Sequence, residues 1–268
     1  MKTAITDVRR PVGDLLREWR RHRRLSQLDL AAEADISTRH LSFVESGRSQ
    51  PSREMILHLS EYLDIPLRER NALLVAAGFA PAYQQTGIDD PVFDTVRHTI
   101  HALLQGFEPY PMLAVDRHWH LIASNQATLR LMAGISPALL QPPVNVLRLS
   151  LHPEGLAPRI RNLAQWRGHL LERLRRQIAA CHDAKLVDLL QELERLPFDA
   201  QGEVPVIPRG GDLAVPMLLE IDGRVLSMLS TTTVFGTPMD VTLAELALEA
   251  FVPANEDTAT YLRDMAGR

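Results

Sequence analysis

Two pairs of histidines have a spacing that could place both imidazoles on one side of the chain. His98 and His101 lie three residues apart in a stretch with helical periodicity, and His118 and His120 lie two residues apart beside a predicted strand. Each pair could share a face and offer nitrogen ligands to a metal ion. No cysteine or carboxylate cluster completes either pair at the spacing of a zinc site. We therefore predict no metal site and no cofactor.

Other groups could suggest catalysis or phosphate binding. Cys181 and His182 combine a nucleophile with a base, but adjacent helical residues point about 100° apart and cannot easily pair. A cysteine packed on a helix explains this position better. The stretch Gly210-Gly211-Asp212 lacks the Gly-x-Gly or Gly-Lys-Ser pattern of a phosphate-binding loop. We predict that the chain is not an enzyme.

Composition indicates a soluble globular protein of about two domains. The chain has 268 residues, of which 46% are hydrophobic and 23% charged, with a formal net charge of −4. The single cysteine fits a reducing compartment, and no apolar run approaches the roughly 20 residues of a membrane span. We expect a cytoplasmic protein without a transmembrane segment.

The charge is unevenly distributed along the chain. Residues 1–79 carry 13 Lys and Arg against 11 Asp and Glu, whereas the remainder carries 16 against 22. The positive charge concentrates in residues 17–24, which contain five arginines. A basic first part can meet phosphate although the whole chain is acidic.

Apolar residues in the first part recur at helical spacing and are interrupted by short turn signals. They predict five short helices, over residues 12–23, 26–34, 38–46, 52–63 and 66–77. The second and third are joined by a tight turn, and the third has a polar N-terminal stripe. This arrangement is typical of a helix-turn-helix that places its second helix in the DNA major groove.

The order of residues resembles the XRE (Cro/cI-type) helix-turn-helix family. The matching stretches are Leu16-Arg17-Glu18-Trp19-Arg20, Leu25-Ser26-Gln27, Leu30-Ala31, Ile36-Ser37, Leu41-Ser42, Glu45-Ser46-Gly47-Arg48 and Pro51-Ser52. Arg24 and Asp35 depart from the pattern, because the family often has glycine there. The resemblance also implies that Arg20 and Glu45 form a pair that ties the first helix to the third.

The position of each residue in this pattern gives it an expected role. Gln27 would reach a phosphate at the start of the second helix. Thr38, Arg39 and Ser42 would face base edges, with Arg39 suited to a bidentate contact with guanine. The full set of predicted DNA-binding residues is Gln27, Ser37, Thr38, Arg39, Ser42, Arg48, Ser49 and Arg53.

The second part alternates between strand and helix patterns after a turn-rich linker over residues 81–91. Strands are expected over residues 112–115, 119–123, 213–221 and 224–235. Helices are expected over 91–106, 125–133, 160–181 and 186–193, with a further short helix capped by Asn145. A Pro- and Gly-rich loop is expected over residues 198–211. Asp222-Gly223 supplies the positive φ angles of a two-residue hairpin turn. The pattern of residues 242–252 is compatible with either a helix or a strand.

A hairpin followed by an Asn-capped helix is typical of the opening of a PAS-like sensor domain. The second part also resembles the MmyB-like ligand-binding domain, which is PAS-like and follows an XRE-type helix-turn-helix. The matching stretches are Asn145-Val146-Leu147-Arg148, His152-Pro153, Trp166, Thr232-Thr233-Val234-Phe235-Gly236-Thr237-Pro238, Asp240-Val241-Thr242 and Phe251-Val252-Pro253-Ala254. The resemblance favours a strand for residues 242–252. It implies a transcription regulator whose pocket holds a small lipophilic molecule such as a fatty acid.

A ligand pocket needs an apolar lining with a few polar groups that orient the ligand. Methionines supply adaptable lining, and Arg148 would suit a carboxylate head group. The predicted ligand-binding residues are Met112, Asn125, Met132, Arg148, His152, Trp166, Met217 and Met228.

These observations predict an all-α helix-turn-helix domain of about five helices over residues 1–80. An α+β, PAS-like domain over residues 92–268 would have an antiparallel sheet with helices on one face. We expect a homodimer that binds a double-stranded DNA operator, because one recognition helix reads only a few base pairs. Two alternatives are a helix-turn-helix fused to a metal- or histidine-dependent enzyme and a protein-interaction adaptor.

Overall fold

The computed structural model describes residues 10–181, 183–197 and 214–267. They divide into two compact units. The first extends to Gln85 and includes residues 239–241, and the second comprises the rest of the described chain from Thr86. The loop predicted over residues 198–211 lies outside the described residues, as does His182.

The first unit consists of five helices, as predicted. They are α1 (Val12–His22), α2 (Gln27–Glu33), α3 (Thr38–Glu45), α4 (Arg53–Tyr62) and α5 (Leu67–Ala76). Ser26, Ser37 and Ser52 start α2, α3 and α4, because each hydroxyl accepts a hydrogen bond from a backbone N–H of the first turn. Arg24 and Asp35 adopt positive φ angles of 59° and 50°. They therefore keep the left-handed turn geometry that glycine would supply.

The contact between α1 and α3 is close and contains a buried ion pair. A Cβ atom on Gly13 would lie 2.3 Å from the carbonyl oxygen of Val44, so only glycine fits there. Next to it, Arg20 donates from Nε to Glu45 Oε1 at 2.6 Å and from Nη2 to Glu45 Oε2 at 2.8 Å. The predicted pair between the first and third helices is therefore present.

Burial and ion pairing act in opposite directions on Glu45. Burial alone would raise the pKa of its carboxyl, but hydrogen bonds from Arg20 and Gln27 and the charges of Arg20 and Arg17 hold that pKa below its ordinary value. The carboxylate is thus ionised in the folded unit, although its side chain is only 1% exposed.

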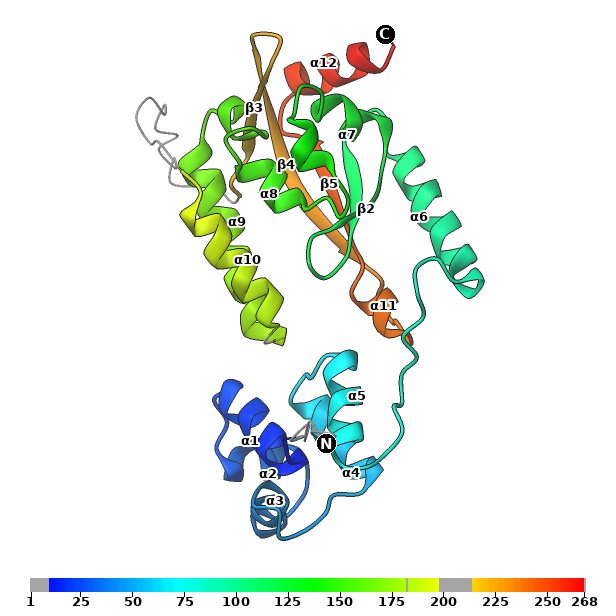
Figure 1. The fold of residues 1–268 in the computed structure, drawn as a ribbon, viewed down its shortest axis with the longest axis vertical. Coiled ribbons are helices and arrows are strands. Elements are labelled where there is room, and N and C mark those ends of the chain that lie inside the picture. Colours follow the sequence, from blue (N-terminus) through cyan, green and yellow to red (C-terminus); the bar gives the residue numbers. More distant parts are fainter. Residues whose placement is uncertain (1–9, 182, 198–213, 268) are drawn as a thin grey trace, which may run out of the picture. The chain divides into compact units, whose positions relative to one another are not determined.

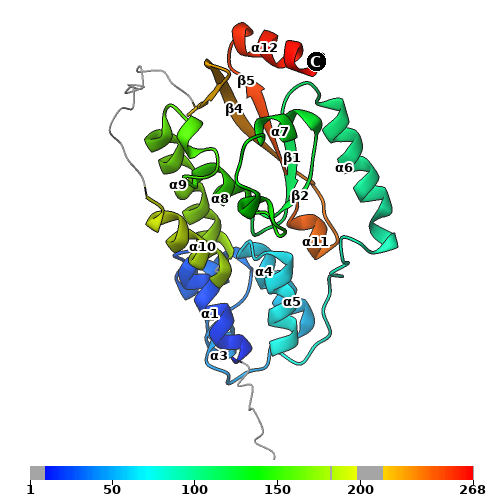
Figure 2. The same cartoon turned by 45° about the horizontal axis from the view of Figure 1, so that its top comes forward.

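The second unit is built on a five-stranded antiparallel sheet in the order β2-β1-β5-β4-β3 (Figures 1 and 2). Its strands are β1 (Met112–Val115), β2 (Leu121–Ser124), β3 (Met217–Ile221), β4 (Arg224–Val234) and β5 (Ala247–Pro253). Asp222 and Gly223 both have positive φ in the turn between β3 and β4, as the hairpin requires. The predicted helix-plus-sheet fold class is therefore confirmed.

Helices lie on both sides of this sheet (Figure 2). The α-helices are α6 (Asp94–Gly106), α7 (Gln126–Leu131), α8 (Val146–Leu151), α9 (Leu163–Cys181), α10 (Ala184–Arg195), α11 (Val241–Ala244) and α12 (Glu256–Ala266). Short 3-10 turns occupy Pro91–Phe93, Pro137–Leu140 and Ala157–Arg159.

Strand β1 is buried on both sides, and this decides where the helices lie. Leu113 and Val115 pack into a core with α8, α9 and α10, whereas Met112 and Ala114 pack against α6. Successive side chains of a strand point to opposite faces, so a fully apolar strand needs cover on each. The predicted helices on one face correspond to α8–α10, and α6 covers the opposite face.

Several element boundaries differ from the sequence expectations. Residues 242–252 are divided, because α11 (Val241–Ala244) precedes strand β5, so the predicted strand is present only from Ala247. Strand β2 begins at Leu121 because Trp119 lies in the preceding turn with a φ of 66°. Helix α9 begins at Leu163 because Ile160 forms a bridge with Leu219 of β3.

Helix α12 was not predicted, although its signal is present in the sequence. Asn255 accepts a hydrogen bond from the backbone of Thr258, and two acidic residues occupy the first turn. Within the described residues, none of the helices is long and apolar enough to cross a bilayer.

We predict that Glu45→Ala lowers the free energy of unfolding of the first unit by about 3 kcal/mol, because it leaves the guanidinium of Arg20 buried without its carboxylate. Hydrogen exchange in α1 and α3 measures this loss. Because the pKa of Glu45 is lowered on folding, its contribution is complete above pH 4.5 and is lost as the pH falls through the folded pKa. Glu18→Ala, which removes an exposed ion pair with Arg10, is the control and changes stability by less than about 1 kcal/mol. Equal effects of the two substitutions would contradict this account.

Candidate functional site

The predicted DNA-binding residues lie on α2, on α3 with its N-cap, in the segment that follows α3, and at Arg53, the first residue of α4. Ser37 starts α3 by accepting a hydrogen bond from the backbone N–H of His40 at 3.1 Å. Thr38 and Ser42 are half-buried on α3, and Arg39 is exposed. The helix therefore presents a short polar stripe with one long cationic side chain, the pattern that reads base edges in a major groove.

Phe43 positions two cationic side chains next to this stripe. The guanidinium carbon of Arg39 lies 5.3 Å from the centroid of the Phe43 ring, and that of Arg48 lies 5.8 Å from it. Cation–π contacts at such distances reduce the freedom of a long side chain. No role for Phe43 was predicted from the sequence, because the signal depends on two arginines that reach the same ring from different segments.

Gln27 is placed differently from the expectation that its amide reaches a phosphate. Its Nε2 donates to Glu45 Oε2 at 2.7 Å, so one of its two amide hydrogens binds the buried carboxylate. The other hydrogen and the start of α2 are what a phosphate contact would use. Ser49 and Arg53 lie beyond α3, half-buried and exposed respectively.

Three of the five arginines of residues 17–24 bind partners inside the first unit. Arg17 contacts Glu45, and Arg20 is buried against the same carboxylate. Arg23 donates to the carbonyl oxygen of Leu63 at 2.7 Å and to that of Asp64 at 2.6 Å. This cluster therefore joins helices, and much of its charge is not directed at a polyanion.

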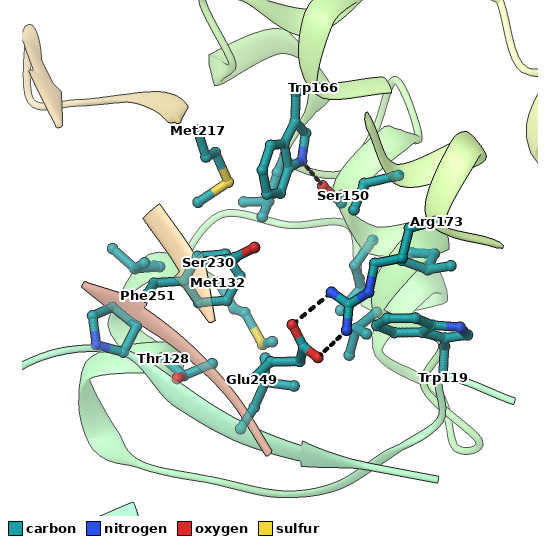
Figure 3. A pocket seen from close by; sticks show the side chains of 18 residues that line it. Trp119, Thr128, Met132, Ser150, Trp166, Arg173, Met217, Ser230, Glu249 and Phe251 are labelled. Carbon is teal, nitrogen blue, oxygen red and sulfur yellow. Dashed lines mark hydrogen bonds and ion pairs between the residues drawn. The ribbon is translucent and has the colours of Figure 1, made fainter. Parts of the chain in front are cut away.

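A small cavity lies inside the second unit, between the sheet and helices α7, α8 and α9 (Figure 3). It encloses about 70 Å³. The lining is mostly apolar and consists of Pro111, Leu113, Trp119, Thr128, Leu131, Met132, Val146, Leu147, Leu149, Ser150, Leu156, Trp166, Leu170, Arg173, Met217, Ser230, Glu249 and Phe251. An apolar cavity of about 150 Å³ accommodates benzene, so a larger ligand requires the walls to move outward.

Three of the eight predicted ligand-binding residues line this cavity: Met132, Trp166 and Met217. The indole N–H of Trp166 donates to the Ser150 hydroxyl at 2.9 Å, which fixes the ring against the cavity. The two methionines supply flexible side chains to its wall.

The other five predicted residues lie elsewhere. Met112 packs on the opposite side of the sheet with α6, and Met228 is in the core but not among the lining residues. Arg148 donates to both carboxylate oxygens of Glu192, at 2.5 and 2.8 Å, which raises the pKa of its guanidinium. The Nδ1 atom of His152 accepts a hydrogen bond from the backbone of Glu154.

Asn125, the fifth, connects three segments of the second unit. Its Oδ1 accepts hydrogen bonds from the backbone N–H groups of Met112 and Thr128, and its Nδ2 donates to the carbonyl oxygen of Tyr110. The side chain thus starts α7 and fixes the entry to β1. This use is structural. Asn125 also lines a separate open cleft of about 510 Å³ beside α6, and its contact with a ligand stays a prediction.

The charged groups at the cavity are Arg173 of α9 and Glu249 of β5 (Figure 3). Arg173 Nη1 donates to Glu249 Oε2 at 2.8 Å, and a second hydrogen bond joins Nη2 to Oε1. Arg173 also donates to the Thr232 hydroxyl at 2.6 Å and stacks 4.6 Å from the centroid of Trp119. Neither residue was predicted from the sequence. A glutamate inside the apolar stretch Leu248-Glu249-Ala250-Phe251 was the signal that could have identified one of them.

Trp119 and Arg173 also line a second, more open cleft of about 220 Å³. Its other lining residues are Val115, Asp116, Arg117, Gln177, Glu245 and Ala247. Arg117 forms ion pairs with Asp183 at 2.8 Å and with Glu245 at 3.3 Å. Arg173 and Trp119 thus line both the cavity and the outer cleft.

One of the two histidine pairs does come together with a carboxylate. Ligand atoms of Asp116, His118 and His120 lie within 4.8 Å of one another. Each imidazole already has a carboxylate partner, since His118 Nε2 lies 2.8 Å from Asp183 and His120 Nδ1 lies 3.0 Å from Asp116. These pairs account for the cluster without a metal ion, and the absence of a metal site stays a prediction. His98 and His101 are exposed on α6.

Comparison with protein families gives two matches. Residues 96–265 match the MmyB-like transcription regulator ligand binding domain, and residues 16–70 match a helix-turn-helix family. The first match covers more than half of the chain. A search of curated proteins finds no match.

We predict that Asn125→Ala lowers the free energy of unfolding of the second unit by about 2 kcal/mol or more. It removes the cap of α7 and leaves buried backbone groups of the β1 entry without partners. Urea unfolding followed by the fluorescence of Trp119 and Trp166, in a Trp19→Phe background, measures the change. Gln126→Ala, at the exposed neighbouring position, is the control. An unchanged stability of Asn125→Ala would instead support the ligand contact expected from the sequence.

Proposed function

The chain belongs to the MmyB-like transcription regulators, and we propose that a small lipophilic, fatty-acid-like molecule in its cavity changes the affinity of its helix-turn-helix for a DNA operator. A DNA-binding transcription regulator with a ligand-binding domain follows from the two family matches, which point to regulation and not to an enzyme. The single observation that carries the ligand part of the proposal is the apolar cavity beside Trp166.

Residues 1–80 are assigned to DNA binding and residues 92–268 to ligand binding, with residues 81–91 as the linker. The exposed Arg39 of α3 is the residue best suited to reach a guanine, supported by its contact with Phe43. Thr38 and Ser42 flank it on the same helix. Ser37, Arg48, Ser49 and Arg53, together with Gln27, would fix the orientation of α3 through the DNA backbone.

A homodimer is part of the proposal. Helix α3 has eight residues and reads only a few base pairs, so two copies on a two-fold symmetric operator supply affinity and selectivity. Since an operator lies in the compartment of the chromosome, the proposed location is the cytoplasm.

The ligand part of the proposal requires the cavity to enlarge. Its 70 Å³ is smaller than a lipophilic chain, and pockets for drug-sized ligands span roughly 300–1,000 Å³. Met132 and Met217 are the apolar lining residues with the most rotatable bonds. Regulation follows if the filled and empty cavities favour forms of the protein with different operator affinities.

We predict that Arg39→Ala weakens binding to the selected operator by about 5- to 150-fold, the loss of one bidentate base contact. The operator is first selected from a random DNA library with the wild-type protein, and affinity is then measured by fluorescence anisotropy at fixed salt. Arg21→Ala, exposed on α1, is the charge-matched control and changes affinity less than threefold. Equal losses with operator and random DNA would reduce Arg39 to a phosphate contact. Unchanged operator affinity would contradict the assignment and favour the adaptor alternative.

We predict that Leu170→Phe abolishes the effect of lipophilic ligands on operator binding, because the larger ring fills the cavity from α9. Operator affinity is measured with and without a saturating ten-carbon fatty acid and the corresponding alcohol. Leu190→Phe, on the neighbouring α10 and not among the lining residues, keeps the ligand effect. A ligand effect that survives in Leu170→Phe would place the ligand outside this cavity.

A further inference from the structure

The polar wall of the cavity consists of one closed ion pair and a few hydroxyl groups. Arg173 and Glu249 are the charged lining residues, and their charges cancel. We propose that the cavity selects a ligand whose polar end is uncharged, such as an alcohol, amide or ester, over an ionised carboxylate or an amine. This inference rests on the proposed ligand-binding function, and it narrows the fatty-acid-like ligand of that proposal to neutral derivatives of a fatty acid in place of the free acid.

The ion pair between Arg173 and Glu249 is already complete. The Glu249 carboxylate, 5% exposed, accepts from Arg173 through both of its oxygens. The guanidinium also donates to Thr232 and stacks on Trp119. Three of the five N–H groups of this guanidinium are thereby engaged, and its positive charge is already neutralised by Glu249.

A ligand carboxylate that bound Arg173 in place of Glu249 would leave the Glu249 carboxylate without its partner. Glu249 is buried on β5, the strand that lies between β1 and β4, so its carboxylate would lose its cation while it remains out of water. Depriving a buried charge of its partner weakens binding by roughly 30- to 4,000-fold. A carboxylate that enters without displacing Glu249 places two negative charges together in a medium of low dielectric constant.

Among the described residues that line the cavity or the outer cleft, no arginine, lysine or histidine lacks an acidic partner. Arg117, the other arginine of the cleft, is shared between Asp183 and Glu245. His169 stacks on Trp166 behind the cavity wall. Burial, reinforced by the charges of Arg173 and Arg176, lowers the pKa of His169, so its imidazole is neutral near pH 7.

Two hydroxyl groups of the cavity wall can bind a neutral polar group. The Ser150 oxygen accepts the indole N–H of Trp166, so the Ser150 hydroxyl hydrogen is directed elsewhere and can be donated. Ser230 adds a second hydroxyl at the edge of the cavity (Figure 3). A carbonyl or hydroxyl oxygen can accept from these groups at no cost in charge burial.

The test compares ligands that share a hydrocarbon chain and differ only at the polar end. Alcohols, primary amides, carboxylates and amines with hexyl to dodecyl chains are titrated into the full-length protein at pH 7.5 by calorimetry. Fluorescence of Trp119 and Trp166 in the full-length Trp19→Phe protein supplies a site-specific signal. The alcohol and amide are expected to bind at least tenfold more tightly than the carboxylate and the amine of the same length.

A charge-removing variant tests the cause of this preference. Glu249→Gln keeps the shape and a hydrogen bond to Arg173 but leaves an uncompensated guanidinium at the cavity. It is expected to bind the carboxylate at least tenfold more tightly than the wild type does, with less than threefold change for the alcohol. The matched control is Glu192→Gln, which opens the bidentate pair of Arg148 away from the cavity and leaves the order of affinities unchanged.

Three outcomes would overturn the inference. Tighter binding of the carboxylate or the amine than of the alcohol by the wild type does so directly, and this comparison needs no variant to fold. A gain in carboxylate affinity in Glu192→Gln instead of Glu249→Gln would move recognition to Arg148. If no member of the series binds with a change in tryptophan fluorescence, the proposed ligand-binding function fails, and the inference fails with it.

Discussion

Each unit of this protein contains a buried glutamate that must keep an arginine beside it. Glu45 in the first unit and Glu249 in the second are almost fully enclosed, and each is held by a bidentate arginine from a different helix. Removing such a carboxylate from water is unfavourable unless a cation and hydrogen bonds replace the lost solvation. The positions of the helices that supply the arginines are therefore constrained, and the functional surfaces follow from those positions.

In the first unit this constraint orients α3 for DNA. The Glu45 carboxylate of α3 contacts Arg20 and Arg17 of α1 and Gln27 of α2, so α1 and α2 are both joined to α3. Arg39 lies on the exposed side of α3, where its guanidinium contacts the Phe43 ring. The basic stretch of residues 17–24 contributes more to this packing than to the charge of the surface.

In the second unit the same constraint shapes the cavity. Arg173 reaches from α9 across the apolar space to Glu249 on β5, so the pair joins helix and sheet where side chains do not fill the gap (Figure 3). Arg173 also lines the outer cleft, with Trp119 stacked on it. The group that connects helix α9 to the sheet is thus also the group that a ligand would meet.

Resemblance to known families indicated the family of each part and implied the Arg20–Glu45 pair. The sequence by itself determined the five helices of the first unit and the Asp222-Gly223 hairpin. These features depend on local spacing and turn chemistry, which are readable along the chain. Only the tertiary structure decided that α6 covers the second face of the sheet, that residues 241–244 are helical before β5, and that Asn125 and Arg148 have partners inside the protein. It also decided that Arg173 and Glu249, 76 residues apart, meet at the cavity. Their charges looked unremarkable on an amphipathic helix and in a strand, because the pairing that keeps them buried exists only after the two segments pack together.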